Sequence, residues 1–302
     1  MKAGLVGLLL GFPSGLAKIA WPLGWPTSLE FLSSGPDADF FEFVSPLAEM
    51  TKLTYTATWG TYFKPSDQNQ SVEGWVRTWP EANPKGGMRA LTFVQESAGR
   101  GVVAFRGTDL NPSGRSGQAD ACANEELAEK PLPAFCNQFT AFELDYVSRA
   151  LDLAQKAAQA HPTVEWLYTG HSLGAELASV VGAVRRAPVL SFAAPPIVPV
   201  LKKRTSVDVK QLPFWKSLSL YNEFDPLRFL ALGELPGANC SWDNQPTPAG
   251  CDACELHGPV NLTSPACQQC FSKTHIFASY LALVRSRSRP TCVVALDESI
   301  EV

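Results

Sequence analysis

Residues 168–178 read YTGHSLGAELA, and this stretch decides the fold of the chain. It contains the pattern Gly-x-Ser-x-Gly around Ser172, with a strand-like run before it, at 163–168, and an apolar helix of small residues after it, at 175–184. A sharp turn between the two lifts the serine hydroxyl clear of a sheet, and only glycines at Gly170 and Gly174 let the backbone close so tightly. The stretch therefore predicts a strand, a tight elbow and a helix.

The same elbow predicts a binding place for a negatively charged oxygen. Leu173 directly follows Ser172 and lies beside the N-terminus of the predicted helix, where the helix dipole is positive. Its backbone N–H can therefore hydrogen-bond to an oxyanion that develops beside the serine.

Length and composition are those of an ordinary globular protein. The chain has 302 residues, 45% of them hydrophobic and 18% charged, enough for one large α/β domain or two small ones with a sizeable core. Its 25 basic residues are scattered among 29 acidic ones, so we expect no nucleic-acid partner. The sequence carries no signal for an oligomeric state.

The N-terminus is typical of a secretory signal. One lysine is followed by an apolar run at 3–12, too short to span a bilayer, and then by small residues near Ala17 and Ala20. We expect residues 1–20 to be a signal peptide and 21–302 one domain, in a secreted protein or in the lumen of the secretory pathway. The alternative is a mobile N-terminal extension. Three sequons are compatible with a glycoprotein: Asn69, Asn239 and Asn261.

Eight cysteines, an even number, favour a disulfide set. Cys122 and Cys136 bracket part of a long polar stretch and could be joined. The segment 236–272 is a cysteine-rich insert, and its Cys-x2-Cys spacing is close to that of a structural zinc site. A reducing compartment would favour zinc, whereas the secretory start favours disulfides of undetermined connectivity. Neither gives a catalytic metal, and no cofactor is expected. The insert's cysteines are Cys251, Cys254, Cys267 and Cys270.

Strand-like and helix-like segments alternate along the chain, which predicts a mostly parallel sheet with helices on both faces. Ser45-Pro46 is typical of a helix start, for a helix that runs to about Thr56, and a capping box at 140–143 opens a helix that ends at His161-Pro162. The polar segment 110–133 is long, as lids and binding loops are. Further strands are expected at 89–95, 101–105, 189–193 and 214–221, the first two as a hairpin, and a last helix at 272–284.

A serine is a good nucleophile only beside a base that a third group orients, and on this fold type the order along the chain is serine, acid, histidine. Four histidines allow elimination. His161 precedes the elbow and ends a helix, and His171 adjoins the serine and cannot reach round to its hydroxyl. His275, at the start of the last predicted helix, is the favoured base; His257, in the insert, is the alternative, and so is a site with neither.

Asp225 is the favoured acid, because it follows a predicted strand at the edge where open α/β sheets place their ligands, and Pro226 fixes the turn behind it. The alternative role for Asp225 is an ordinary turn aspartate that bonds its own backbone. Thr108, after an early strand, is the favoured second oxyanion donor through its N–H and hydroxyl. Arg106, beside it, could be a structural anchor paired with a carboxylate. The other acids considered after the serine are Asp208, Asp243, Asp252, Glu223 and Glu234.

Together these motifs resemble those of the fungal-type (class 3) lipase family, in the family's order and over roughly residues 45–283. The matching segments are VAFRGT at 103–108, GHSLG at 170–174, SFAAP at 191–195, NEFDP at 222–226 and THIF at 274–277. The resemblance implies an α/β-hydrolase fold with a nucleophile, an acid and a base at Ser172, Asp225 and His275. It also implies an oxyanion hole at Thr108 and Leu173, and a lid position at 110–136.

Three features depart from the family pattern. Glu176 stands where the family usually has a small residue, although a carboxylate is tolerable in the first turn of a helix. The lid region is more polar than that of an interfacially activated lipase. The cysteine-rich insert between acid and base is not a usual family feature.

These observations predict a serine hydrolase that cleaves carboxylic esters of acylglycerols or glycerolipids. Its partner is a lipid or another ester, and a lipid–water interface is one place where it would meet this substrate. Phospholipase, galactolipase, feruloyl-type esterase and acyltransferase activities are alternatives on the same triad, since the pocket sets the substrate. The alternative from another class is an inactive lipase-like protein that binds a lipid or a partner.

Overall fold

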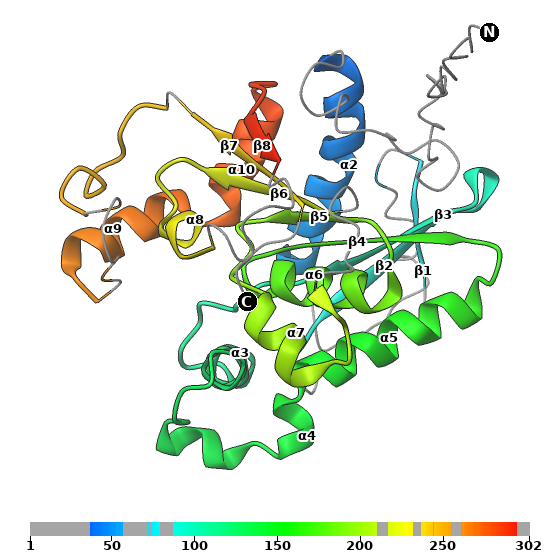
Figure 1. The fold of residues 1–302 in the computed structure, drawn as a ribbon, viewed down its shortest axis with the longest axis horizontal. Coiled ribbons are helices and arrows are strands. Elements are labelled where there is room, and N and C mark those ends of the chain that lie inside the picture. The colour runs from blue at the N-terminus through cyan, green and yellow to red at the C-terminus, as the bar shows by residue number, and fades with distance from the viewer. Residues whose placement is uncertain are drawn as a thin grey trace, which may run out of the picture.

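The computed structural model describes residues 37–56, 72, 74–78, 87–209, 217–231, 237–243, 245–254, 256, 261 and 263–294. Within them the chain forms one eight-stranded sheet whose strands lie side by side in chain order (Figure 1). The pairs from β3 to β7 are parallel, and β1, β2 and β8 are antiparallel at the edges. The strands are β1 Val76–Thr78, β2 Ala90–Gln95, β3 Arg100–Phe105, β4 Glu165–His171, β5 Val189–Phe192, β6 Ser217–Asn222, β7 Ala238–Trp242 and β8 Thr291–Val294.

Helices cover both faces of this sheet, as the alternation of segments predicts. α5, α6 and α7 pack on one face, and α2 and α10 on the other. The helices are α2 Asp37–Thr56, α3 Arg115–Leu127, α4 Ala141–Leu144, α5 Tyr146–Ala160, α6 Leu173–Arg185, α7 Val198–Arg204, α8 Pro226–Ala231, α9 Pro265–Thr274 and α10 Phe277–Arg285. None of them, in the part of the chain that the structure describes, combines the length and apolar character needed to cross a bilayer.

Apolar side chains alternate between two cores along each central strand. Val103 and Phe105 in β3 face α5 and α6, whereas Val102 and Ala104 face α2 and α10. All of them are buried. A strand buried on both faces reads as a continuous apolar run, which is why periodicity did not orient these strands in advance.

The helix expected to start at Ser45-Pro46 begins at Asp37, so the predicted start is wrong. Pro46 lies inside α2, where proline is unfavourable by about 3 kcal/mol. The turns before it bury Phe40, Phe41 and Val44 to 1% exposure or less. Each such side chain contributes about 2 kcal/mol on burial, so tertiary packing outweighs the local proline signal.

The capping box at Thr140 is confirmed, but the helix behind it is divided. α4 ends after one turn, and the Asp145 side chain then caps α5 by accepting a hydrogen bond from the Ser148 N–H at 3.1 Å. The predicted long loop at 110–133 likewise contains a helix, α3, which the disulfide Cys122–Cys136 ties to the following segment.

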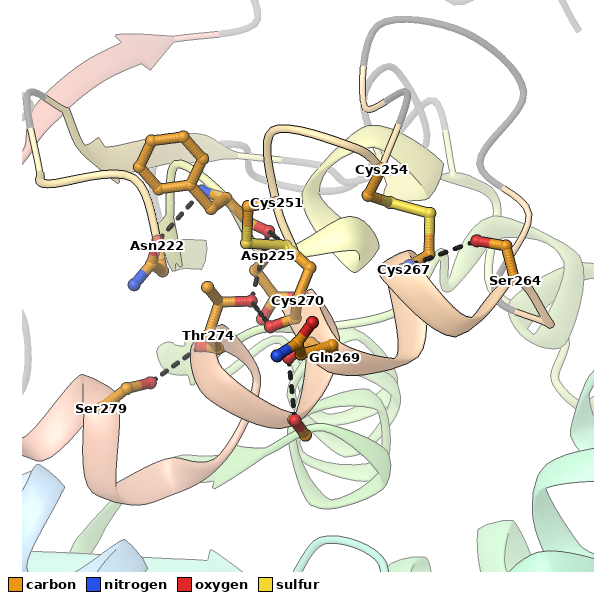
Figure 2. The surroundings of a disulfide bond; sticks show 12 residues. Asn222, Asp225, Cys251, Cys254, Ser264, Cys267, Gln269, Cys270, Thr274 and Ser279 are labelled. Carbon is orange, nitrogen blue, oxygen red and sulfur yellow. Dashed lines mark hydrogen bonds between the residues drawn. A yellow bond between two sulfur atoms is a disulfide. The ribbon is translucent and has the colours of Figure 1, made fainter. Parts of the chain in front are cut away.

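The cysteine-rich insert is shorter than the predicted 236–272, because its first residues form β7 in the central sheet. All eight cysteines are paired, so the disulfide interpretation is confirmed and the zinc alternative is wrong. Cys240–Cys292 joins β7 to β8. Cys251–Cys270 and Cys254–Cys267 attach the insert to α9 (Figure 2).

The predicted signal peptide at 1–20, His257 and Asn69 lie outside the described residues.

Candidate active site

The elbow has the strained geometry that its glycines predict. Ser172, between β4 and α6, has φ 56° and ψ −127°, in the region that a non-glycine residue rarely adopts. A Cβ added at Gly170 would lie 2.3 Å from the carbonyl oxygen of Gly174, and one added at Gly174 would lie 2.3 Å from that of Phe105. Any other residue at either position would therefore force β4, α6 and the end of β3 apart.

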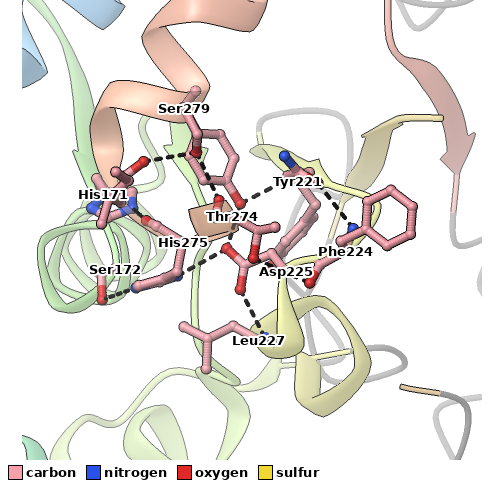
Figure 3. Close-up of polar contacts among 12 residues, drawn as sticks. His171, Ser172, Tyr221, Phe224, Asp225, Leu227, Thr274, His275 and Ser279 are labelled. Carbon is pink, nitrogen blue, oxygen red and sulfur yellow. Dashed lines mark hydrogen bonds and ion pairs between the residues drawn. The ribbon is translucent and has the colours of Figure 1, made fainter. Parts of the chain in front are cut away.

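The structure brings Ser172, His275 and Asp225 into one hydrogen-bonded row (Figure 3). The His275 Nε2 atom lies 2.9 Å from the Ser172 Oγ, and its Nδ1 atom lies 2.8 Å from the Asp225 Oδ2. Since a carboxylate only accepts, Nδ1 carries the proton and Nε2 can accept the serine proton. This is the relation that a serine nucleophile needs with its base and its orienting acid.

Asp225 is fully buried at the end of β6, and its carboxylate is held from several sides. The Tyr280 hydroxyl donates to Oδ2 at 2.5 Å, and the Leu227 N–H donates to Oδ1 at 2.9 Å. Burial alone would raise the pKa of Asp225, but the charge and hydrogen bond of His275 and the bonds from Tyr280 and Leu227 outweigh it and hold that pKa below its usual value. The carboxylate therefore stays ionised beside the imidazole.

The sequence predicts that His275 lies at the start of a helix, but in the structure it lies between two helices. It caps the C-terminus of α9, and Ile276 caps the N-terminus of α10. Thr274 is fully buried, and its hydroxyl lies 2.9 Å from the carbonyl oxygen of Cys270 and 3.2 Å from that of Phe224. The contact with Phe224 links the residue before His275 to the residue before Asp225.

His171 cannot act as the base, as predicted, yet it contacts the site. Its Nε2 lies 2.6 Å from the carbonyl oxygen of His275, and its Nδ1 lies 2.7 Å from the Tyr55 hydroxyl. A carbonyl only accepts, so Nε2 is protonated and Nδ1 accepts from Tyr55. Burial, helped by the nearby His275, holds the pKa of His171 well below its usual value. His171 is thus neutral and supports the backbone of His275.

Sequence reasoning missed Tyr280, Tyr55 and Asn124. Tyr280, in α10, also accepts a hydrogen bond from the Asn222 N–H at 3.2 Å, so one hydroxyl links Asp225 to the end of β6. The only local signal for this role is that Tyr280 follows His275 by just over one helical turn. This spacing does not distinguish Tyr280 from an ordinary core tyrosine.

Thr108 lines the same cleft as Ser172, and Leu173 directly follows Ser172 in the elbow. Leu173 is the first residue of α6, and a first helical residue has no intrahelical acceptor for its N–H. The Thr108 hydroxyl accepts a hydrogen bond from the Asn124 side chain of α3 at 2.9 Å. Its own proton therefore remains available for donation towards a substrate oxygen.

Arg106 is a structural anchor beneath α3. Its guanidinium pairs with Asp120, and both side chains are 4% exposed or less. Asp120 also accepts from the Asp109 N–H at 2.8 Å and from the Tyr146 hydroxyl at 2.7 Å. A helix inside the predicted lid segment is thereby fastened to the end of β3.

A cleft with a volume of about 1250 Å³ opens above the serine. Its walls are mainly apolar and come from α3, α6, α7 and the start of α10. Ser172, His275 and Thr108 lie in its lining, together with Glu176, Leu127 and Val200. Such a cleft can accept an apolar chain while its carbonyl carbon approaches the serine hydroxyl.

A mostly parallel sheet, helices on both faces and a nucleophile elbow after a central strand together define the α/β-hydrolase fold. No protein-family model matches the chain. A relative named "Putative lipase ATG15", from Vanderwaltozyma polyspora, is 26% identical over 199 residues, which are 57% of this chain and 33% of the relative. The chain thus spans about a third of that relative's length.

Solved structures of fungal proteins are similar at lower identity. A mutant form of MDLA from Penicillium cyclopium is 19% identical, with 70% of this chain and 82% of that chain covered and a TM-score of 0.41. Lip2 lipase from Yarrowia lipolytica is 14% identical, with 68% and 78% covered and a TM-score of 0.41.

Proposed function

We propose that the chain is a serine hydrolase that cleaves carboxylic esters through an acyl-enzyme, with Ser172 as nucleophile, His275 as base and Asp225 as orienting acid. The observation that carries the proposal is the row of contacts from the Ser172 Oγ to the His275 Nε2, at 2.9 Å, and from the His275 Nδ1 to the Asp225 Oδ2, at 2.8 Å.

In the first half-reaction, the Ser172 Oγ attacks the ester carbonyl carbon while His275 takes its proton. The carbonyl oxygen becomes an oxyanion that accepts from the Leu173 N–H and from Thr108. His275 then returns the proton to the alcohol oxygen as the carbon–oxygen bond breaks, which leaves an acyl group on Ser172. In the second half-reaction, water attacks this acyl group by the same steps and releases the acid.

The proposed substrates are acylglycerols or other glycerolipids. An apolar cleft beside Ser172 suits an acyl chain, and the relative named ATG15 carries the word lipase in its description. The pairing of every cysteine further supports a secreted protein or one in the lumen of the secretory pathway. Comparison of triacylglycerol, phospholipid, galactolipid and feruloyl esters as substrates would identify the class of ester.

The proposal is tested with Ser172→Ala, assayed for turnover of p-nitrophenyl esters. We expect the variant to lose at least about 10³-fold in kcat, because no acyl-enzyme forms. Ser179→Ala, which removes a buried serine two turns further along α6, is the matched control and should keep turnover. Turnover by Ser172→Ala comparable to that of the unaltered protein would reject the proposal, and so would a protein that cleaves none of these esters.

A further inference from the structure

Glu176 is a carboxylic acid in the wall of the apolar cleft, one helical turn after Ser172. It lies in the first turn of α6 and is 6% exposed. Helical side chains lean towards the helix N-terminus, so residues four apart lie on one face with the later one over the earlier turn. The Glu176 side chain therefore extends towards the turn that holds Ser172, and it belongs to the cleft lining.

Within the described residues the Glu176 carboxyl group has no hydrogen-bond or ion-pair partner. Its oxygens are nevertheless not among the fully enclosed unpaired atoms of these residues, such as the Ser179 hydroxyl in the same helix. The small exposed part of the residue thus includes the carboxyl oxygens, and the space they reach is the cleft. A buried polar group without a partner is unfavourable unless a ligand supplies one.

The other charged groups of the cleft already have partners in the protein. Arg106 is paired with Asp120, Lys52 with Glu49 and Lys130 with Glu125. Arg89 also has an interaction of its own. No described cation of the cleft therefore neutralises Glu176.

Burial raises the pKa of Glu176 to about 8, and no neighbouring charge contributes to the shift. The ionisable side chains that line the cleft with Glu176 are Lys52, Tyr55, Arg89, Arg106, Asp109, Glu125, Glu129, Lys130, His171 and His275. The strands and the helix packed against α6 also carry Glu165 and Tyr168 in β4, Arg100 in β3, and Tyr146, Arg149, Asp152 and Lys156 in α5. The carboxyl group is therefore neutral in acid and becomes an anion inside the cleft in mild alkali.

We propose that Glu176 determines the charge selectivity of the cleft: as a neutral acid it admits uncharged esters, and as an anion it pairs with a cationic group, such as a quaternary ammonium, carried by the substrate. The inference rests on the proposed function, because only an esterase would use this selectivity to choose its substrate. Measurement of binding alone is nevertheless enough to test it.

The experiment uses two esters of nearly the same shape, choline butyrate and 3,3-dimethylbutyl butyrate. The first carries a quaternary ammonium, whose charge is independent of pH, and the second has carbon in place of nitrogen. Their dissociation constants are measured at pH 6 and pH 9 on the Ser172→Ala protein, which binds without turnover. We expect the preference for the choline ester to rise about tenfold from pH 6 to pH 9, as an anion appears within reach of the cation.

Two further proteins assign the effect. Ser172→Ala with Glu176→Gln should show no change of preference with pH, because glutamine stays neutral. Ser172→Ala with Glu125→Gln, which removes a partly exposed carboxylate of the same cleft, should keep the tenfold rise. Glu176→Ala replaces Gln if glutamine disturbs the packing of α6.

An unchanged preference in the Ser172→Ala protein would overturn the inference, as would a rise that persists without Glu176 or a failure of both esters to bind at either pH. A protein with the expected preference but no esterase activity would retain the inference and contradict the proposed function. Esterase activity together with a binding preference that does not change with pH would support the proposed function and overturn the inference.

Discussion

The orientation of His275 depends on the groups that hold Asp225. With Asp225→Asn, the amide can donate to Nδ1, which favours the tautomer with Nε2 protonated and blocks proton transfer from Ser172. We expect kcat to fall about 10⁴-fold. Tyr280→Phe removes only the hydroxyl that lies 2.5 Å from the carboxylate, so kcat/KM should fall about tenfold.

Steady-state kinetics on short-chain esters, with thermal melting of each variant as a check on folding, measures both effects. Equal losses in the two variants would contradict the assignment of Asp225 as the direct partner and Tyr280 as its support.

Glu176 also makes a prediction about stability. Its pKa is raised to about 8 in the folded protein and is about 4.3 in an unfolded chain, so the folded state binds the extra proton between these values. A raised pKa gives stability that is complete below pH 4.3 and is lost as pH rises through 8. Between pH 5 and pH 8 this group should lower the free energy of unfolding by more than about 1 kcal/mol, and Glu176→Gln should abolish that decrease.

Urea unfolding at pH 5, 6.5 and 8 measures this slope, and Glu125→Gln is the matched control that should retain it. A slope of the same size in Glu176→Gln and in the unaltered protein would show that another group titrates.

Residues in the elbow were the most predictable from sequence, because a serine between two glycines after a strand indicates a tight turn into a helix. Ser172, Asp225 and His275 were selected in advance, and the structure places them together. Tyr280 and Asn124 could not be selected, because each acts through hydrogen bonds to residues of other segments of the chain. Their roles exist only once the chain is folded.

At the scale of elements, α9 and the insert joined to it fix the position of His275. Cys270 is fully buried in α9, one turn before Thr274, and Cys251–Cys270 fixes that turn. Replacing both cysteines by alanine should lower the free energy of unfolding by about 3 kcal/mol. It should also lower kcat more than about tenfold, because His275 loses its register with Ser172.

The matched control is the pair Cys240 and Cys292, which joins β7 to β8 at the sheet edge and whose members are 52 positions apart in the sequence. Its replacement should lower stability by a similar amount and leave kcat within about twofold. A loss of kcat as large as that of the α9 pair would show that the insert has no special role. Chemical unfolding and ester turnover, measured on the same preparations, separate the two effects.

Elements with a strong local signal were predicted with their bounds, and those that depend on tertiary contacts were not. The elbow helix runs from Leu173 to Arg185, within two residues of the predicted bounds 175–184. β7 and β8 are short, lie next to prolines and pair with each other and with β6, so nothing local marks them as strands. α3 has a polar exposed face and is fixed by Asp120 and Cys122, contacts that a sequence pattern does not contain.

At the scale of the whole molecule, the surface separates two of the sequons. Asn261 is exposed, and its side chain accepts from the Thr263 N–H at 3.0 Å. Asn239 lies in β7 between β6 and β8, with its side-chain oxygen enclosed. When the protein is produced in a eukaryotic secretory host, we expect a glycan at Asn261 and none at Asn239.

Peptide mass spectrometry before and after glycosidase treatment reads each position. Asn261→Gln should abolish the mass shift at that peptide. A glycan at Asn239 would contradict the placement of β7 inside the sheet.

The central claim is that a single serine, activated by His275, does the chemistry. Its most direct test is reaction with a fluorophosphonate, followed by peptide mapping of the whole chain. We expect one adduct, on Ser172, which disappears in Ser172→Ala and forms at least about 10²-fold more slowly in His275→Ala. An unlabelled protein, or one whose adduct lies on another residue, would contradict it.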